Sequence, residues 1–107
     1  MLDGMTGLVS HKMFMERLVE EIARAKRHGE KLTLLFLDLD KFKRINDTYG
    51  HLFGDKVIKE TADIIKNNVR THDIVGRYGG EEYSVILVNT EKSDCQITVE
   101  RIRENVQ

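Results

Sequence analysis

The segment from Arg77 to Tyr83, with the sequence Arg-Tyr-Gly-Gly-Glu-Glu-Tyr, constrains the fold of this chain more than any other stretch. Residues 73–76 before it and 84–88 after it predict two extended strands. Two strands joined by Gly-Gly form a tight hairpin, because glycine adopts the positive φ angles that such turns require. Two carboxylates follow the turn directly. They are therefore expected at the rim of a sheet, where they stay hydrated and can hold a cation.

A second pair of acids follows another strand. Residues 32–37 form an almost unbroken apolar run, which predicts a strand buried on both faces. The run ends in Asp38-Leu39-Asp40, and residues two apart in an extended chain point to the same face. Acids closing one strand and opening another suggest a carboxylate cluster at one end of a sheet. Oxygen ligands of this kind suit Mg²⁺ or Mn²⁺, which leave other positions to water and phosphates.

Length and composition limit the number of domains, the partners and the location that this chain can have. A chain of 107 residues has room for one domain with a modest core. Its net charge of −1 gives no general attraction to nucleic acid or anionic membranes, so no nucleic-acid partner is expected. The single cysteine, Cys95, excludes an internal disulfide and fits a reducing, cytoplasmic location. No secretory signal or bilayer-spanning apolar run is visible, and any membrane tether of a parent protein would lie in segments outside this chain.

Capping residues and apolar spacing predict the helices. Ser10 caps a helix that ends at Gly29, and a short helix from residue 42 stops at Gly50. A further helix covers about residues 54–69. Ser93, with Gln96 three residues later, looks like a capping box for the last helix. Helices interleaved with a hairpin and one separate strand indicate an α+β fold.

Four motifs in one order resemble the GGDEF family of diguanylate cyclases. They are Asp3–Leu8, Asp38–His51 followed by Gly54-Asp55, Arg70–Asp73 and Gly79–Tyr83. The last is the name-giving motif in its GGEEF form, with tyrosine in place of the final phenylalanine. One Gly-Gly-Glu-Glu alone would be a weak signal, but four ordered motifs argue against chance. Residues 1–107 are thus expected to be a partial GGDEF domain, about two thirds of a family domain.

The resemblance implies the ferredoxin-like palm shared with nucleotidyl cyclases and many polymerases, an antiparallel sheet with helices packed on it. There the strand ending at Asp38 lies beside the strand that opens with Glu81, which brings the two carboxylates together. The family's last strand and last helix have no counterpart here. We therefore expect an unpaired edge on strand 32–37, a hazard for aggregation or strand swapping, and weakened GTP binding, because that helix supplies Lys and Arg to the triphosphate.

The resemblance assigns Asp38, the Leu39 carbonyl and Glu81 as ligands of one or two Mg²⁺ or Mn²⁺ ions. Such an ion lowers the pKa of a ribose 3′-hydroxyl and stabilises charge on the phosphates. Glu82 is a candidate second ligand or general base, and the choice of general base between Glu81 and Glu82 stays open. The alternative is a solvated, charged sheet rim.

The same resemblance implies a nucleotide site. Asn46 and Asp55 would read guanine, which favours GTP over ATP; alternatively, they make an Asx turn and a helix-terminal acid. The backbone N–H groups of Phe42 and Lys43 open a short helix and can cradle phosphates. Gly80 lets phosphate approach the backbone, since a side chain would block it.

Arg70 and Asp73 fit the family's inhibitory site for the product, separate from the active site. Arginine binds phosphate or guanine edges in a planar, bidentate manner. The alternative is a turn that closes one helix and starts a strand.

These features predict a diguanylate cyclase that condenses two GTP into cyclic di-GMP and two pyrophosphates. Each site holds one GTP, so catalysis needs a homodimer, which an upstream sensory domain of the parent protein would control. One alternative is a non-catalytic module that binds cyclic di-GMP or GTP. Another is a palm enzyme of other specificity, which would share the metal ligands but not Asn46, Asp55 or the Arg70–Asp73 pair.

Overall fold

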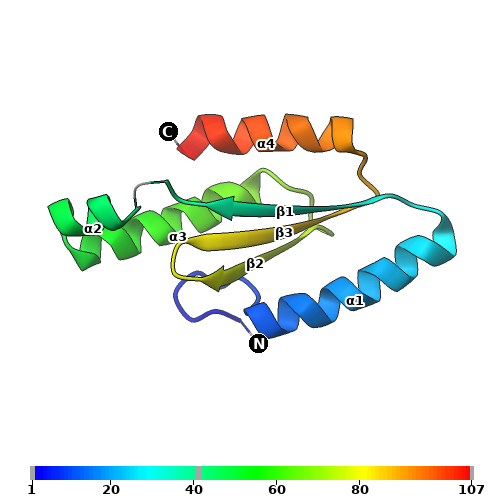
Figure 1. The fold of residues 1–107 in the computed structure, drawn as a ribbon, viewed down its shortest axis with the longest axis horizontal. Coiled ribbons are helices and arrows are strands. Elements are labelled where there is room, and N and C mark those ends of the chain that lie inside the picture. The colour runs from blue at the N-terminus through cyan, green and yellow to red at the C-terminus, as the bar shows by residue number, and fades with distance from the viewer. Residues whose placement is uncertain (1, 41, 107) are drawn as a thin grey trace.

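A computed structural model describes residues 2–40 and 42–106 of the chain (Figure 1). Along the chain, the elements are α1 (His11–His28), β1 (Leu32–Asp38), α2 (Phe42–Tyr49), α3 (His51–Asn67), β2 (Ile74–Gly79), β3 (Glu82–Val88) and α4 (Lys92–Val106). Within those described residues, none of the helices combines the length and apolar character needed to cross a membrane.

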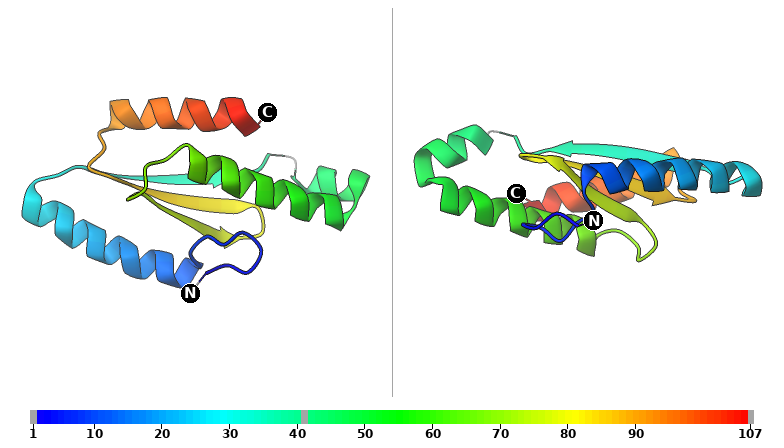
Figure 2. Two further views of the ribbon diagram at one scale, coloured as in Figure 1. Left: turned by 180° about the vertical axis from the view of Figure 1, so that it is seen from behind. Right: turned by 90° about the horizontal axis from the view of Figure 1, so that it is seen from below.

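The three strands form one antiparallel sheet in the order β1–β3–β2. Helices α3 and α4 pack on one face of the sheet, and α1 packs on the other (Figures 1 and 2). This arrangement is the predicted α+β fold. Within residues 2–40 and 42–106, β1 pairs with β3 on one side and with no strand on the other, as predicted.

The core is divided by β3, whose side chains from Tyr83 to Val88 are buried on both faces. Tyr83, Val85 and Leu87 belong to the cluster under α3 and α4, whereas Ile86 and Val88 belong to the cluster under α1. Because successive side chains of β3 point to opposite faces of the sheet, this one strand contributes to both halves of the core.

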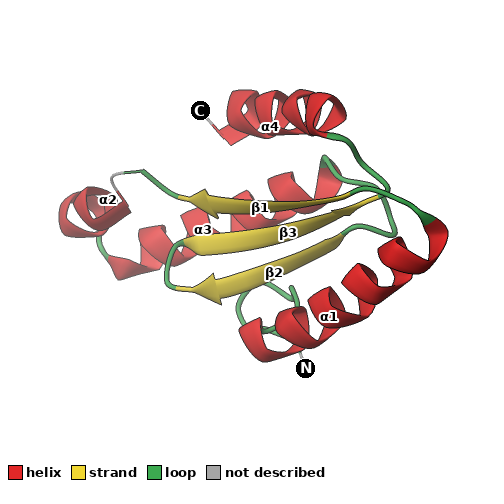
Figure 3. Ribbon diagram, turned by 45° about the vertical axis from the view of Figure 1, so that its right-hand side comes forward, coloured by secondary structure: helices red, strands yellow, loops and turns green. Residues whose placement is uncertain are grey.

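The expectation that residues 32–37 are buried on both faces is wrong. Leu34 and Phe36 of β1 are 38% and 70% exposed, while Leu35 and Leu37 pack against the core under α3 and α4. The physical reason is that α1 packs mainly along β2 and leaves the corresponding face of β1 uncovered (Figure 3). The strand that is buried on both faces is β3.

The starts of α3 and α4 differ from the expectation, whereas the start of α1 is confirmed. The Ser10 hydroxyl accepts a hydrogen bond from the Met13 N–H at 3.3 Å, so Ser10 caps α1 as predicted. Helix α4 already begins at Lys92, because the Cys95 N–H donates to the Glu91 carbonyl, and the predicted Ser93 cap is therefore wrong. Helix α3 begins one turn before the predicted Gly54, because the Gly54 N–H donates to the Gly50 carbonyl.

Candidate nucleotide and metal site

The hairpin between β2 and β3 turns at Gly80 and Glu81, one residue later than the Gly-Gly pattern predicts. Gly80 has a φ of 52°, in the left-handed region that favours glycine. Gly79 still belongs to β2 and pairs with Glu82, the first residue of β3. Glu81 is therefore a turn residue rather than the first residue of the strand.

The acids of two separate segments meet at this end of the sheet. Asp38, the last residue of β1, lies directly opposite Glu82 in the β1–β3 ladder. The Leu39 N–H donates to the Glu81 carbonyl at 3.2 Å, which places the turn beside the end of β1. Asp38 and Glu82 are exposed and Glu81 is half-buried. Like charges directly opposite each other repel, so a cation at this end of the sheet would relieve that repulsion.

The donor set fits a hard divalent ion with few protein ligands. Among residues 2–40 and 42–106, no cluster of three or more His, Cys, Asp or Glu side chains is arranged to hold a metal. Magnesium usually takes only one or two carboxylates and completes its shell with water and phosphate. Asp38, Glu81 and a main-chain carbonyl such as that of Leu39 meet this requirement in kind.

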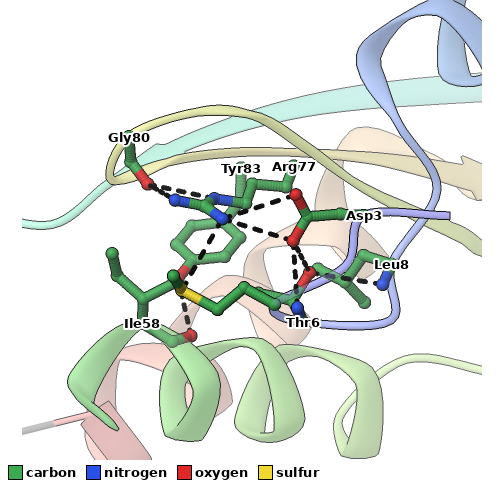
Figure 4. A network of polar contacts seen from close by, with 8 residues as sticks. Asp3, Thr6, Leu8, Ile58, Arg77, Gly80 and Tyr83 are labelled. Atoms are coloured by element: carbon green, nitrogen blue, oxygen red, sulfur yellow. Dashed lines mark hydrogen bonds and ion pairs between the residues drawn. The ribbon is translucent and has the colours of Figure 1, made fainter. Parts of the chain in front are cut away.

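An ion-pair network that the motif reading did not identify supports the hairpin (Figure 4). Two guanidinium nitrogens of Arg77 donate to the Gly80 carbonyl at 2.9 and 3.1 Å. A third donates to the Asp3 carboxylate at 3.3 and 3.4 Å. Asp3 also accepts from the Thr6 N–H and hydroxyl at 2.9 and 2.7 Å. The turn that carries Glu81 is thus tied to the beginning of the chain.

The Asp3 carboxyl has a lowered pKa. Burial on its own raises the pKa, but hydrogen bonds from Thr6, together with the hydrogen bond and charge of Arg77, outweigh that effect. A carboxyl with a lowered pKa in the folded state stabilises the fold above its unfolded pKa of about 3.9, and this contribution is lost as the pH falls through the folded pKa.

We therefore expect Asp3→Asn to remove an acid-sensitive part of the stability. The free energy of unfolding should be lower for Asp3→Asn than for the parent chain near neutral pH, and the gap should narrow below about pH 4. Urea unfolding between pH 3 and 7 measures both values. Asp63→Asn, at an exposed carboxylate of α3, is the control. A gap for Asp3→Asn that stays constant across this range would contradict the role of the charged carboxylate.

Tyr83, which stands where the family motif has phenylalanine, fits the core because its hydroxyl has a partner. The O–H donates to the Ile58 carbonyl of α3 at 2.8 Å, and the side chain is buried. Burial raises the pKa of Tyr83 to about 12; the charge of Arg77 lowers it and that of Asp3 raises it. The substitution is thus accommodated without an unpaired buried hydroxyl.

Asn46 belongs to α2, and its side chain lies against Gly54 of α3. Its Oδ1 is buried and has no hydrogen-bond partner among the described residues. A Cβ on Gly54 would lie 1.7 Å from this oxygen, so only glycine leaves room for the amide. Gly54 was part of the predicted nucleotide motif but was assigned no role there. It precedes Asp55, which is exposed in α3. A buried acceptor without a partner is costly unless a ligand satisfies it.

The two residues that are predicted to bind phosphate through their backbone N–H groups open helix α2. Helix α2 begins at Phe42, as expected, and the Phe42 side chain is buried in the core. Lys43 is exposed on the next position of the helix. The two residues follow the acidic end of β1 along the chain, so the predicted phosphate ligands are near the predicted metal ligands in sequence.

Arg70 and Asp73 come together as predicted, but at the other end of the sheet. The Asp73 carboxylate is 1% exposed and accepts from the Arg70 N–H at 2.8 Å and the Val88 N–H at 2.9 Å. The half-exposed Arg70 guanidinium bonds Asp73, the Val88 carbonyl and the Thr90 hydroxyl. Val88 ends β3 and Glu82 begins it, which separates this pair from the hairpin by about 20 Å. The alternative reading, a turn that closes α3 and starts β2, also describes this pair.

A cavity of about 680 Å³ adjoins this pair. Its walls include the basic side chains of Arg17, Arg24, Lys66 and Arg70. Glu21 and Asp73 also line it, and Arg24 and Arg70 form ion pairs with them, so the cavity carries a modest excess of positive charge. An excess of this sign favours an anionic ligand.

Comparison with known proteins decides the family. The model of the family described as "Diguanylate cyclase, GGDEF domain" matches residues 1–107. The chain belongs to the GGDEF family. It is 45% identical over 108 residues to diguanylate cyclase A of Treponema denticola and 39% identical over 106 residues to diguanylate cyclase DosC of Escherichia coli K12. The matches cover 98% and 99% of this chain but only 29% and 23% of the relatives, so the chain spans about a quarter of their length.

Solved GGDEF structures share the fold. The GGDEF domain of DgcB from Caulobacter crescentus, in complex with c-di-GMP, superposes with a TM-score of 0.93 at 38% identity. The match covers 97% of this chain and 61% of that one. Diguanylate cyclase SiaD from Pseudomonas aeruginosa, in complex with its activator SiaC, gives a TM-score of 0.91 at 43% identity over 96% of this chain and 40% of that one. The predicted GGDEF fold class is confirmed.

Proposed function

We propose that this GGDEF domain is the catalytic part of a diguanylate cyclase. The reaction condenses two GTP into cyclic di-GMP and releases two pyrophosphates. The observation that carries the proposal is the meeting of Asp38 with Glu82, and of Leu39 with Glu81, at one end of the sheet. Family membership and relatives named diguanylate cyclases support it.

Asp38, Glu81 and the Leu39 carbonyl would hold Mg²⁺ or Mn²⁺. When bound, such an ion lowers the pKa of the attacking 3′-hydroxyl and stabilises negative charge on the α-phosphate and the leaving pyrophosphate. Glu81 or Glu82 accepts the proton of that hydroxyl, since both lie at the acidic end of the sheet. Each 3′-oxygen forms a bond to the α-phosphorus of the other GTP, and the bond to pyrophosphate breaks.

The hairpin glycines leave space for the nucleotide. A Cβ on Gly79 or Gly80 would meet nothing within 4 Å. Gly80 is required by its positive φ, but Gly79 has no such conformation, so the folded chain itself does not demand glycine there. A phosphate that approaches the hairpin backbone would explain why residue 79 is also glycine. The backbone N–H groups that open α2 at Phe42 and Lys43 would bind the outer phosphates.

Asn46 and Asp55 would select guanine. The unpartnered Oδ1 of Asn46 is an acceptor for a guanine N–H group, and the exposed Asp55 carboxylate can accept from further N–H groups of the same base. Adenine lacks the N1–H and the 2-amino group, so it would leave both acceptors unsatisfied. Because the Asn46 acceptor is buried, a base without the matching donor would leave it unsatisfied, and the site would discriminate against that base.

The complete reaction requires two GTP-loaded subunits that face each other. Each subunit supplies one nucleotide, so the catalytic unit is a homodimer. The relatives extend well beyond the matched region, and we propose that upstream sensory segments of the parent protein control this pairing.

The test is incubation of the longer parent protein with GTP and Mg²⁺, followed by mass analysis of the products. Cyclic di-GMP and pyrophosphate are the expected products. Binding of GTP or cyclic di-GMP without turnover would instead support a non-catalytic binding module. A linear or mixed dinucleotide would indicate a palm enzyme of other specificity.

We further propose that Arg70 and Asp73 form an inhibitory site for the product, supported by the basic cavity beside them. In an active parent protein, Arg70→Ala should raise the concentration of cyclic di-GMP that halves the rate by at least about tenfold, the equivalent of 1.4 kcal/mol of lost binding. Arg27→Ala, at an exposed arginine outside this cavity, is the control. If the same concentration of cyclic di-GMP halves the rate of Arg70→Ala and of the parent protein, the proposed inhibitory site is wrong.

A further inference from the structure

Tyr83 connects the acidic end of the sheet to helix α3. It is the second residue of β3, the central strand, and it directly follows Glu81 and Glu82. Its ring extends toward α3, where its hydroxyl donates to the Ile58 carbonyl at 2.8 Å (Figure 4). Among the residues that the structure describes, this is the only hydrogen bond between α3 and a strand of the sheet.

This hydrogen bond is shielded from water and does not depend on pH near neutrality. Tyr83 and Ile58 are 1% and 3% exposed. Burial raises the pKa of Tyr83 to about 12, so its hydroxyl keeps its proton and remains a donor. The Ile58 carbonyl lies inside α3, where it can accept the helical bond and the tyrosine bond at once, because a carbonyl oxygen has two lone pairs.

The first turns of α3 have little packing of their own. Before Ile58, Gly54 is the only buried residue of the helix, and it has no side chain. Helix α3 is held on the sheet mainly by Ile58 and the buried residues that follow it. The bond to Tyr83 therefore meets the helix at the boundary between its packed part and the turn that carries Asp55.

The proposed GTP site is divided between two parts of the fold. Asn46 and Asp55, which would bind guanine, belong to α2 and α3. Asp38 and Glu81, which would bind the metal and through it the phosphates, lie at the end of the sheet. A ligand that occupies two subsites gains from both only if their spacing matches the ligand, and catalysis requires that spacing to be held closely.

We propose that Tyr83 is a positioning residue: it holds the guanine-binding turn of α3 at a fixed distance from the acidic end of the sheet, so that one GTP fits both subsites. This inference rests on the proposed function. It assigns to the tyrosine hydroxyl a role that is separate from filling the core, because the ring alone fills the core.

Phenylalanine, which the family motif has at this position, would fill the same space but could not donate a hydrogen bond. Apolar packing has no strong directional preference, so α3 would stay on the sheet while its first turns could shift relative to the hairpin. Tyr83→Phe removes only the hydroxyl, and the Ile58 carbonyl keeps its helical bond. The variant should therefore remain folded, and it isolates the effect of this one hydrogen bond.

Binding of whole and partial ligands to the longer parent protein tests the proposal. The ligands are a GTP analogue with a methylene group between the α- and β-phosphorus, guanosine, and magnesium pyrophosphate. The analogue spans both subsites and cannot release pyrophosphate, whereas the other two ligands occupy one subsite each. Equilibrium competition against the labelled analogue, with Mg²⁺ present, measures all three affinities.

Tyr83→Phe should weaken binding of the analogue about three- to tenfold, the range expected when one hydrogen bond is lost. The affinities for guanosine and magnesium pyrophosphate should stay unchanged. Tyr78→Phe, which makes the same chemical change at an exposed tyrosine of β2, should leave all three affinities unchanged. Urea unfolding of each variant verifies that it is folded.

Three results would overturn the inference. An analogue affinity that Tyr83→Phe leaves unchanged would limit the hydroxyl to stabilising the fold. An equal loss for guanosine or for magnesium pyrophosphate would place its effect within one subsite rather than between the two. A parent protein that binds neither guanosine nor magnesium pyrophosphate would overturn the proposed function, and this inference with it.

Discussion

Glu81→Gln is expected to reduce the turnover of GTP by an active parent protein at least about 100-fold, equivalent to close to 3 kcal/mol of transition-state stabilisation. The replacement keeps the size of the side chain but removes the negative charge that would hold the divalent ion. The hairpin should persist, because the bond from Leu39 is accepted by the Glu81 backbone carbonyl. Initial rates of pyrophosphate release over a range of Mg²⁺ concentrations measure the effect.

Glu91→Gln is the matched control for this experiment. Glu91 is an exposed glutamate that follows β3 at the end of the sheet away from the hairpin. Its replacement makes the same change in net charge, so it should leave the rate close to that of the parent protein. If Glu81→Gln turns over GTP at the rate of the parent protein, Glu81 is not a metal ligand, even if the protein proves to be a cyclase.

Gly54→Ala should have the second large effect, on both nucleotide binding and stability. A Cβ at this position would lie 1.7 Å from Oδ1 and 2.9 Å from Cγ of Asn46, and 3.3 Å from the Phe42 ring. Asn46 must then leave its place. We expect at least a tenfold loss of GTP affinity, together with a loss of about 1–3 kcal/mol in the free energy of unfolding from overpacking.

The expected change in the free energy of unfolding is opposite in sign to the usual effect of this substitution. Alanine in place of glycine inside a helix normally stabilises by up to about 1 kcal/mol, so a loss at Gly54 would report the clash with Asn46. Gly4→Ala, where a Cβ would meet nothing within 4 Å, is the control. Urea unfolding and calorimetric titration with GTP measure the two effects. A stabilised Gly54→Ala that retains GTP affinity would contradict the proposed role of this pair.

Local patterns predicted the elements well because each depends on nearby residues. The apolar run, the Gly-Gly turn and the Ser10 cap act over a few positions, and their elements formed close to the expected places. The run at 32–37 could not reveal which face would be covered, since that depends on where α1 packs. Leu34 and Phe36 are exposed for this reason.

The supporting contacts of the candidate site were not predictable in the same way. Asp3 and Arg77 are 74 positions apart, and no local pattern requires them to pair. Gly54 and Asn46 meet across the junction of α2 and α3, so the need for glycine appears only when both helices are placed. The ordered motifs, by contrast, predicted acids from two segments at one end of the sheet, and Asp38 and Glu82 pair there.

The position of β3 at the centre of the sheet has a consequence for how the domain loses its structure. Its odd-numbered side chains anchor the layer under α3 and α4, and its even-numbered side chains anchor the layer under α1. Neither layer can melt while the other stays intact, because both would have to release the same strand. A chain of this size with two small cores should therefore denature in a single all-or-none transition.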